Sequence, residues 1–285
     1  MKICYLILAH NNFIHLDRLI NALDDADVMF YIHLDEKAAG KYISGKENVI
    51  VIPHHQNINW GGYGMVEATL ALLRYSNVHS PHADYFALIS GVDYPIRPRS
   101  FFYNQLARGK EFIDAAPMPF LDKPMKRFEY YYFDIDRRRY GYFHPKIVAE
   151  MALCLFRIKR KVPFKLYVGG QWFALTRQCV EYVLDMVDTD KRYERFFRYS
   201  LIPDEAFFQT IIAHSPFAAN IVPNMTYTDW TGPNPPVNIG MRHIDFFAEH
   251  IEIKDEYGIR YPFFARKFDD DSGSVIDAIE QVLRS

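Results

Sequence analysis

The strongest constraint on the fold is the alternation of apolar strand-like runs with helix-like segments in the first hundred residues. Residues 2–9 (KICYLILA) are almost continuously apolar, which is typical of a strand covered on both faces in a parallel sheet. Apolar side chains then recur at helical spacing in residues 14–23, and a second apolar run follows at 28–34. A strand, a helix and a strand in this order form a unit in which the two strands pair in parallel.

The rest of the chain continues this pattern and predicts an α/β fold. We expect further strands at 48–53, 84–90, 169–176 and 225–230, and helices at 64–79, 178–187, 201–215 and 274–284. The order β-α-β-β-α-β predicts a mostly parallel central sheet flanked by helices, as in Rossmann-like proteins. No repeat or long linker divides the chain. We therefore expect one domain over 1–285, with a nucleotide-binding half at about 1–110 and a catalytic and acceptor half at about 111–285.

Charge and cysteine content exclude several classes of protein. The net charge is −2, so nothing global favours nucleic acid. Cys4, Cys154 and Cys179 are too few and too scattered for a disulfide framework or a zinc site, and we expect all three in the core. The N-terminal run lacks a cleavage site, and no run reaches the roughly 18 apolar residues of a membrane span. These features predict a soluble, cytoplasmic protein.

Two segments indicate contacts with other molecules. Residues 157–161 (RIKRK) are a basic cluster, which is typical of a solvated helix end. The alternative is contact with an acidic acceptor or an anionic membrane, which would make the protein peripheral to the inner face of that membrane. Residues 129–143 mix aromatic and charged side chains, which indicates a binding loop or edge structure. The chain has 23 Phe and 20 Tyr, and we expect those outside the core to line a sugar cleft.

Polar residues follow three of the predicted strands. The first, second and fourth strands lead into His10, Asp35 and Asp93, with Gly91 just before the last of these. Ligands of open α/β sheets bind at the carboxyl ends of the strands. A carboxylate suits the hydroxyl groups of a ribose, and a glycine lets the backbone approach a ligand closely. Together the three strand ends indicate a nucleotide site.

The carboxylates argue against a metal ion. A pair of the type Asp-x-Asp holds a divalent cation against a diphosphate in many nucleotide-sugar transferases. Here Asp93 is preceded two positions earlier by Gly91. A true Asp-x-Asp occurs at Asp134 and Asp136, but arginines follow it directly, and Asp269–Asp271 is expected in a solvated loop. We predict that the protein uses no metal.

Two further segments suit transfer of a group from a diphosphate. Arg266 and Lys267 lie between phenylalanines in FFARKF, and fixed cations beside a phosphate can replace a metal ion. The alternative is a pair of surface cations. Glu205 in PDEAFFQT is a carboxylate at a helix start and suits the base of an inverting transfer. The alternative is a purely structural acidic pair, in which Asp204 caps the helix.

The three tryptophans have polar or glycine neighbours and are candidate sugar platforms. They are Trp60 beside two glycines, Trp172 beside Gln171, and Trp230 beside Asp229. A place in the core is the alternative, and for Trp172 the sequence favours neither.

The chain resembles the core-2/I-branching β-1,6-N-acetylglucosaminyltransferases, a family that includes peptide O-xylosyltransferases. The segments that carry this resemblance are LILAHNN, HLDEK, WGGYGMVEATLALL, YFALISGVDYPI, GGQWFALTRQCVEYVL, PDEAFFQT, YTDW and FARKF, in this order. They span about residues 2–269. The resemblance implies a GT-A fold, an inverting mechanism, a UDP-sugar as co-substrate and independence from metal ions.

The resemblance also implies roles for single residues. Glu205 corresponds to the catalytic base of the family, and Lys267 to its diphosphate-binding lysine. His10 and Asp35 would lie at the uridine and ribose. Asp93 would lie near the donor sugar or its phosphates.

Other positions are less closely defined by the resemblance. Trp230 would face a sugar, and the second cation for the diphosphate is either Arg242 or Arg266. Residues assigned to substrate binding are Trp172, Gln171 and Glu129, the last together with Lys126 and Arg127. The membrane anchor, stem and disulfides of the animal members have no expected counterpart, so a luminal location is not implied.

The expected reaction is transfer of a sugar, N-acetylglucosamine before xylose, from UDP to a hydroxyl of a glycan or glycoconjugate. One alternative is a UDP-xylose-dependent enzyme of the same fold. Another is a non-catalytic carbohydrate-binding protein on a decayed transferase fold, against which the presence of both Glu205 and Lys267 argues. A metal-dependent hydrolase is disfavoured by the missing carboxylate partner. We expect no nucleic-acid partner.

Overall fold

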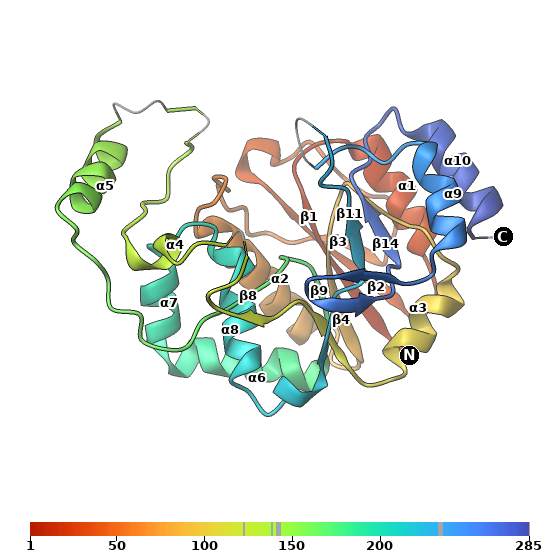
Figure 1. Ribbon diagram of the computed structural model, residues 1–285. Coiled ribbons are helices and arrows are strands. Elements are labelled where there is room, and N and C mark those ends of the chain that lie inside the picture. Colours follow the sequence, from red (N-terminus) through yellow and green to blue (C-terminus); the bar gives the residue numbers. More distant parts are fainter. Residues whose placement is uncertain (122, 138, 141–143, 233–235, 285) are drawn as a thin grey trace.

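The apolar runs of the first hundred residues form four adjacent strands of a seven-stranded sheet, from its centre to one edge (Figure 1). The computed structural model describes all residues except 122, 138, 141–143, 233–235 and 285. Its main sheet has the spatial order β10 (Ile221–Val222), β6 (Glu111–Ile113), β9 (Phe173–Thr176), β4 (Tyr85–Ser90), β1 (Ile3–Ala9), β2 (Val28–Leu34) and β3 (Val49–Val51). Strands β4, β1, β2 and β3 are parallel, whereas β9 is antiparallel to both of its neighbours. The predicted mostly parallel α/β sheet is confirmed.

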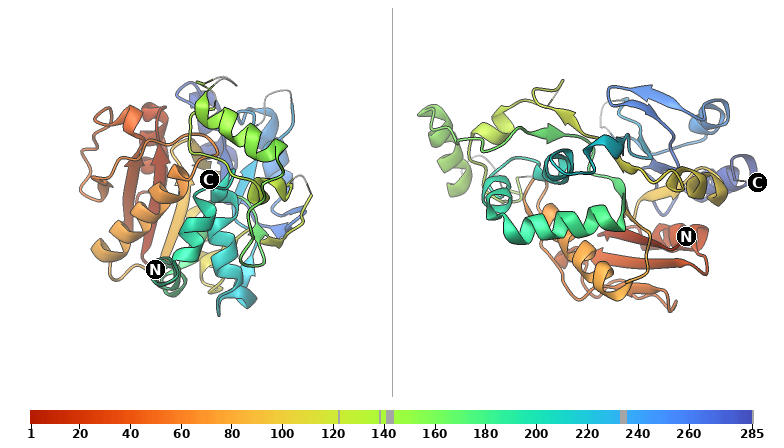
Figure 2. Two further views of the ribbon diagram at one scale, coloured as in Figure 1. Left: turned by 90° about the vertical axis from the view of Figure 1, so that its left-hand side faces the viewer. Right: turned by 90° about the horizontal axis from the view of Figure 1, so that it is seen from below.

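Helices cover both faces of this sheet because both faces are apolar. Alternate residues of β1 enter opposite cores, with Tyr5 in one and Leu6 in the other. One core is closed by α1 (Phe13–Leu23), α3 (Arg99–Leu106), α9 (Arg242–Glu249) and α10 (Gly273–Val282). The other is closed by α2 (Gly64–His79), α6 (Arg177–Thr189), α7 (Lys191–Phe197) and α8 (Phe207–Ala213). Figure 2 shows these two helical layers on either side of the strands.

A second, three-stranded sheet brings the C-terminal part of the chain to the strand ends of the first. It consists of β11 (Thr226–Thr228), β14 (Phe264–Arg266) and β5 (Asp93–Pro95), and β5 follows almost directly on β4. Its register places Arg266 opposite both Asp93 and Thr228. Two small antiparallel pairs complete the strands, β7 (Ala116–Pro117) with β8 (Tyr167–Val168) and β12 (Ile253–Asp255) with β13 (Gly258–Arg260).

The remaining helices lie at the margins. They are α4 (Lys126–Glu129), α5 (Pro145–Leu155) and the 3₁₀ helices η1 (Glu36–Ala38), η2 (Pro203–Glu205) and η3 (Ala218–Asn220). Helix α5 lies at the outer edge of the molecule in Figure 1 and in the right-hand view of Figure 2. Among the described residues, no helix has both the length and the hydrophobicity needed to cross a bilayer.

Three expectations from the sequence need correction. The helix expected at 201–215 is divided into η2 and α8, since Ala206 between them leaves the helical conformation. The strand expected at 169–176 starts only at Phe173, because the two glycines before it pack against Asp114. Cys154 is exposed on α5, whereas Cys4 and Cys179 are buried as expected.

Candidate active site

Three strand ends meet at one edge of the main sheet. The N–H of Asp35, after β2, donates to the carbonyl of Ala9 at the end of β1 (3.0 Å). The N–H of Gly91, after β4, donates to the carbonyl of Leu8 (2.9 Å). These bonds place the three polar strand ends side by side, as the sequence predicted.

Asp35 and His10 form one side of this edge. The buried carboxylate of Asp35 accepts hydrogen bonds from the N–H groups of Lys37 (2.9 Å) and Ile58 (3.2 Å), which fixes the following loop. Desolvation lowers the pKa of His10, and the charge of Asp35 opposes that shift. Lys267 and Lys37 lower it further. His10 is therefore neutral at pH 7, and the charge of Lys267 acts at the tip of the first strand.

Asp93 and Arg266 form a buried ion pair at the centre of the site. Asp93 is fully buried, its Oδ2 accepts from the N–H of Ser90 (2.9 Å), and its Oδ1 lies 3.3 Å from Arg266 Nε. Burial raises the pKa of Asp93 to about 6, although Arg266 and Lys267 oppose the shift. Burial lowers the pKa of Arg266, and Asp93 opposes that change. Thus Arg266, whose side chain is 14% exposed, is a largely buried partner of Asp93 and is not a surface cation.

The indole ring of Trp172 packs against the guanidinium of Arg266. The guanidinium carbon lies 4.2 Å from the centre of the indole ring, within the range of a cation–π contact. Trp172 is itself buried, so it belongs to the core and is not an exposed sugar platform. Its neighbour Gln171 has a buried Nε2 without a hydrogen-bond partner among the described residues. A buried unpaired donor at a site of this kind is available to a ligand.

Two cations hold the side chain of Glu205 at the end of η2. Lys123 Nζ lies 2.5 Å and Arg127 Nη1 3.0 Å from the same carboxylate oxygen, Oε2. Within the described chain, Oε1 makes no hydrogen bond. The side chain is 27% exposed. The carboxylate is therefore anchored through one oxygen while its other oxygen is open to a reactant.

The sequence analysis missed the contact between Glu205 and Lys123. Arg127 was considered only as a companion of Glu129 in acceptor binding. No local pattern could have found these contacts, because 82 and 78 residues separate Lys123 and Arg127 from Glu205. The capping alternative for Asp204 is wrong, since neither η2 nor α8 has a side-chain cap among the described residues.

The backbone connects Glu205 to the cations near the C-terminus. The N–H of Gly169 donates to the carbonyl of Glu205 (2.9 Å), and Trp172 beneath Arg266 follows three positions later. Since one residue of extended chain spans at most about 3.6 Å, the backbone of Trp172 lies within about 11 Å of the backbone of Gly169. Glu205, Arg266 and Lys267 thus belong to one region of the molecule.

Asp229 organises a second group of residues after β11. Against the raising effect of burial, hydrogen bonds from Thr231 and His243 hold the pKa of Asp229 well below its ordinary value. Its Oδ2 also pairs with Arg242 Nη2 at 2.9 Å. The side chain of Arg242 is 66% exposed, and Trp230 beside Asp229 is 65% exposed.

The second group lies next to Lys267 in the fold. The N–H of Ile239 donates to the carbonyl of Lys267 (2.8 Å), and Arg242 starts α9 three residues later. Of the two candidates for a second phosphate-binding cation, Arg242 is the exposed one and Arg266 the buried one.

Glu129 pairs with Lys159 Nζ at 3.1 Å and makes no described contact with Glu205. Its carbonyl accepts from the N–H of Arg160 (2.7 Å). Arg160 also donates to the carbonyls of Phe196 and Tyr199. The cluster at 157–161 is therefore partly structural, and Arg160 is not part of a solvated helix end as expected.

The carboxylates considered as metal ligands have other contacts. Asp134 accepts from Asn59 Nδ2 (2.9 Å) and from the N–H of Gly64 at the start of α2 (3.2 Å). Asp136 lies 3.9 Å from Lys37 Nζ. Among the described residues, no group of three or more His, Cys, Asp or Glu side chains is arranged to hold a metal ion. Arg138, which follows this pair, lies outside the described residues.

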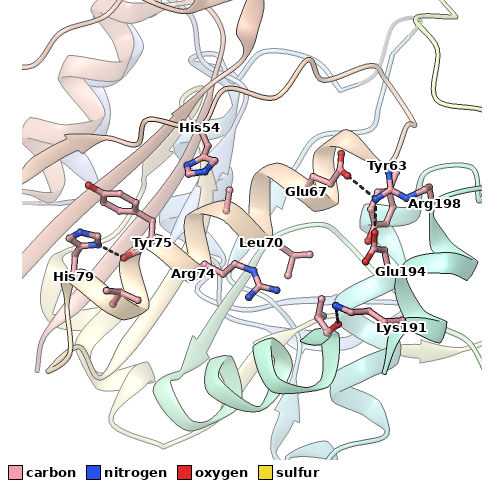
Figure 3. A pocket seen from close by; sticks show the side chains of 13 residues that line it. His54, Tyr63, Glu67, Leu70, Arg74, Tyr75, His79, Lys191, Glu194 and Arg198 are labelled. Carbon is pink, nitrogen blue, oxygen red and sulfur yellow. Dashed lines mark hydrogen bonds and ion pairs between the residues drawn. The ribbon is translucent and has the colours of Figure 1, made fainter. Parts of the chain in front are cut away.

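A cavity of about 460 Å³ lies elsewhere, between α2 and the helices α6 and α7. Figure 3 shows Arg198 directed at Glu67 and Glu194 on its wall. Arg74, which also lines it, pairs with Asp188. No predicted site residue lines this cavity, so it is separate from the strand-end site.

Comparisons with known proteins show which family the chain belongs to. The model of the Core-2/I-Branching enzyme family matches residues 3–252. The chain is 28% identical over 251 residues to Xylosyltransferase 2 of Mus musculus, 28% over 248 residues to Xylosyltransferase 2 of Homo sapiens, and 27% over 248 residues to Xylosyltransferase 1 of Pan troglodytes. Each match covers 81% of this chain, and 27%, 27% and 24% of these relatives respectively. The chain therefore spans about a quarter of the length of the curated relatives that it matches.

Proposed function

Because the chain belongs to the core-2/I-branching enzyme family, we propose that it is an inverting glycosyltransferase that moves a sugar from UDP to a hydroxyl group of a glycan or glycoconjugate. One observation carries this proposal. A carboxylate with one open oxygen, Glu205, shares a region with Arg266 and Lys267 at the strand ends of an α/β sheet. A base and fixed cations in one site are what displacement of a diphosphate requires.

The donor binds at the strand ends. Asp35 and His10 contact the ribose and the uracil. The buried carboxylate of Asp35 accepts hydrogen bonds from hydroxyl and N–H groups, and the neutral imidazole of His10 makes hydrogen bonds without adding a positive charge. Lys267 binds the diphosphate. Arg242 is the second cation in this proposal, because its side chain is exposed and follows closely on Ile239, which binds the backbone of Lys267, while Arg266 is largely buried against Asp93.

Arg266 and Asp93 have positioning roles. The buried pair fixes the end of β14 and thereby the start of the Lys267 side chain. The unpaired Nε2 of Gln171 lies next to Trp172 and is the donor we assign to the leaving or transferred group. Trp230 supplies an exposed ring for a sugar face.

Glu205 acts as the general base. Its Oε1 takes the proton of the acceptor hydroxyl while that oxygen forms a bond to the anomeric carbon. The bond from the anomeric carbon to UDP breaks, and the pair of electrons leaves with the diphosphate. Lys123 and Arg127 keep the carboxylate in place through Oε2. No metal is needed, because side-chain cations meet the charge of the departing UDP.

The transferred sugar is the open part of this proposal. The resemblance of the sequence favours N-acetylglucosamine, while the names of the matched relatives favour xylose. Xylose is therefore a second candidate. The location in the cytoplasm stays a prediction from the sequence.

A panel of UDP-sugars tests the function. We expect UDP release with one of UDP-N-acetylglucosamine or UDP-xylose, and a decrease in kcat of about 10²–10⁴-fold in Glu205→Gln with UDP binding retained. Glu47→Gln is the matched control, because this carboxylate is exposed in the loop before β3. Unchanged turnover in Glu205→Gln would reject the base. Binding of UDP-sugars without turnover in the wild type would favour the carbohydrate-binding alternative.

A further inference from the structure

Helix α5 exposes apolar side chains where a surface helix normally carries polar ones. Val148, Met151 and Leu155 follow one another at helical spacing and are all exposed, and the exposure of Leu155 reaches 78%. The apolar surface continues past the helix end, where Phe156 is 75% exposed and Ile158 is exposed as well. A contiguous patch of this kind on a globular protein marks an interaction site.

The acidic side chain of this helix faces inward. Glu150 is buried, accepts from the N–H of Phe133 (2.6 Å), and pairs with Arg137 (2.6 and 2.8 Å). The charged group therefore attaches α5 to the protein, and the outward face is left apolar. This is the reverse of the usual amphipathic arrangement.

The segment that carries the apolar patch is rich in basic residues, of which Lys159 pairs with the carboxylate of Glu129. Residues 144–165 contain six basic residues and one acidic residue, the inward Glu150. Arg157 and Lys161 are exposed and have no ion-pair partner in the part of the chain that the structure describes. Lys146 is exposed at the start of the helix. An apolar face with a basic border and no exposed acid matches the chemistry of an anionic lipid surface.

The position of α5 makes its outer face accessible. The helix lies at the edge of the molecule, away from the main sheet (Figures 1 and 2). Lys146 Nζ donates to the carbonyl of Asp134, whose side chain binds Asn59 (2.9 Å). Through these contacts α5 is tied to the loops at the strand ends, on the same edge as the candidate active site.

We propose that the outer face of α5, together with Phe156, Arg157, Ile158 and Lys161, docks the protein on the surface of an anionic lipid bilayer. The apolar side chains enter the boundary between headgroups and acyl chains, and the cations remain at the headgroups. A second copy of the chain would also cover apolar side chains. It is disfavoured because paired copies would bring the basic borders together.

Fluorescence from Cys154 tests this docking directly. It is the exposed cysteine of the three and lies beside Leu155, while Cys4 and Cys179 are buried. An environment-sensitive maleimide dye at Cys154 should shift to the blue with vesicles of phosphatidylcholine and phosphatidylglycerol, and much less with phosphatidylcholine alone. Co-sedimentation of the unlabelled protein with the same vesicles gives the partition coefficient.

Two double variants separate the contribution of the apolar side chains to vesicle binding from that of the cations. Leu155→Asp/Phe156→Asp should weaken partition at least tenfold, because each side chain contributes burial of a large apolar group. Arg157→Glu/Lys161→Glu should weaken it more than tenfold, since each cation near the surface contributes about fivefold. Matched controls with exposed residues elsewhere, Ile43→Asp/Ile251→Asp and Lys41→Glu/Lys254→Glu, should partition like the wild type.

Three results would overturn the proposal. They are absence of binding to the charged vesicles, equal binding to uncharged ones, and equal binding by Leu155→Asp/Phe156→Asp. A dimer in sedimentation velocity that this double variant abolishes would assign the face to a second copy instead. Thermal unfolding of each variant shows that it is folded. Partition is measured without donor or acceptor, so its outcome is independent of the proposed transferase activity.

Discussion

Asp204 is a residue whose charge the fold disfavours. Its carboxyl group is buried next to Glu205, and burial followed by the charge of Glu205 raises its pKa to about 7. Lys123 and Arg127 oppose this shift, but both pair with Glu205. The acid in this position is thus largely protonated below neutral pH.

Replacement of this acid should therefore change how stability depends on pH. The folded state binds the proton of Asp204 more tightly than the unfolded state, where the pKa is near 3.8. The stability that this group contributes is present below about pH 4 and is lost as pH rises to about 7. The side chain of Asp204→Asn cannot ionise, so the variant does not lose this stability as the pH rises. The free energy of unfolding of the variant minus that of the wild type should therefore increase by up to about 4 kcal/mol between pH 4 and pH 8.

Urea denaturation at these two pH values measures the effect. Glu47→Gln, a change at an exposed carboxylate in a loop, is the control and should leave the pH dependence unaltered. The same stability difference for Asp204→Asn at both pH values would mean that Asp204 titrates normally.

Residue types and order predicted much of the candidate site, but not its contacts. Glu205, Lys267 and the strand-end residues stand out locally as polar groups in apolar surroundings. Lys123 does not, since nothing in its neighbourhood distinguishes it from a surface lysine until the fold brings it to Glu205. Trp172 was ambiguous for the same reason, because only the fold places Arg266 on its ring.

At the scale of elements, the loop of Gly169 and Gly170 joins the two halves of the site. Its backbone runs against Asp114, which belongs to a buried network with Arg260 and Asn224. A Cβ on Gly169 would lie 1.9 Å from the carbonyl oxygen of Asp114. The backbone of Asp114 therefore leaves no room for a side chain at position 169.

Gly169→Ala should consequently destabilise the protein by at least about 3 kcal/mol, at the upper end of overpacking effects. It should also lower kcat, because the shifted loop carries the N–H that binds the carbonyl of Glu205. Chemical denaturation and UDP release measure the two effects. Gly45→Ala is the matched control, since a Cβ there meets nothing within 4 Å; equal stability of the two variants would contradict the packing argument.

The elements differ in how well the sequence predicts them. Helix α2 was expected at 64–79 and occupies Gly64–His79, because its length and apolar spacing are local properties. Strand β11 (three residues) lies within the strand expected at 225–230, whereas β5 and β14 were not expected, because three residues each are too few for a periodic pattern. Strand β14 pairs with β11 at positions 38 residues away and with β5 at positions 169 to 173 residues away, and no short window of sequence contains that information.

At the scale of the whole molecule, the donor site is assembled from both ends of the chain. His10 and Asp35 come from the first strands, and Lys267 comes from the end of β14. A ligand that contacts both parts binds only the folded state and stabilises it by RT ln(1 + [L]/Kd). UDP should therefore raise the melting temperature even when EDTA removes every divalent cation, because side chains supply the positive charge.

The size of this shift follows from the affinity. At a UDP concentration of about 100 times Kd the stabilisation is about 2.7 kcal/mol, which is about 5 °C or more for a chain of this size. Lys267→Ala should lose most of the shift, whereas Lys254→Ala, which removes an exposed cation on β12, should keep it. A shift in the wild type that appears only with Mn²⁺ would show that a metal ion meets the charge of the diphosphate. A full shift in Lys267→Ala would place the diphosphate elsewhere, and the proposed pairing of Lys267 with Arg242 around UDP would then be wrong.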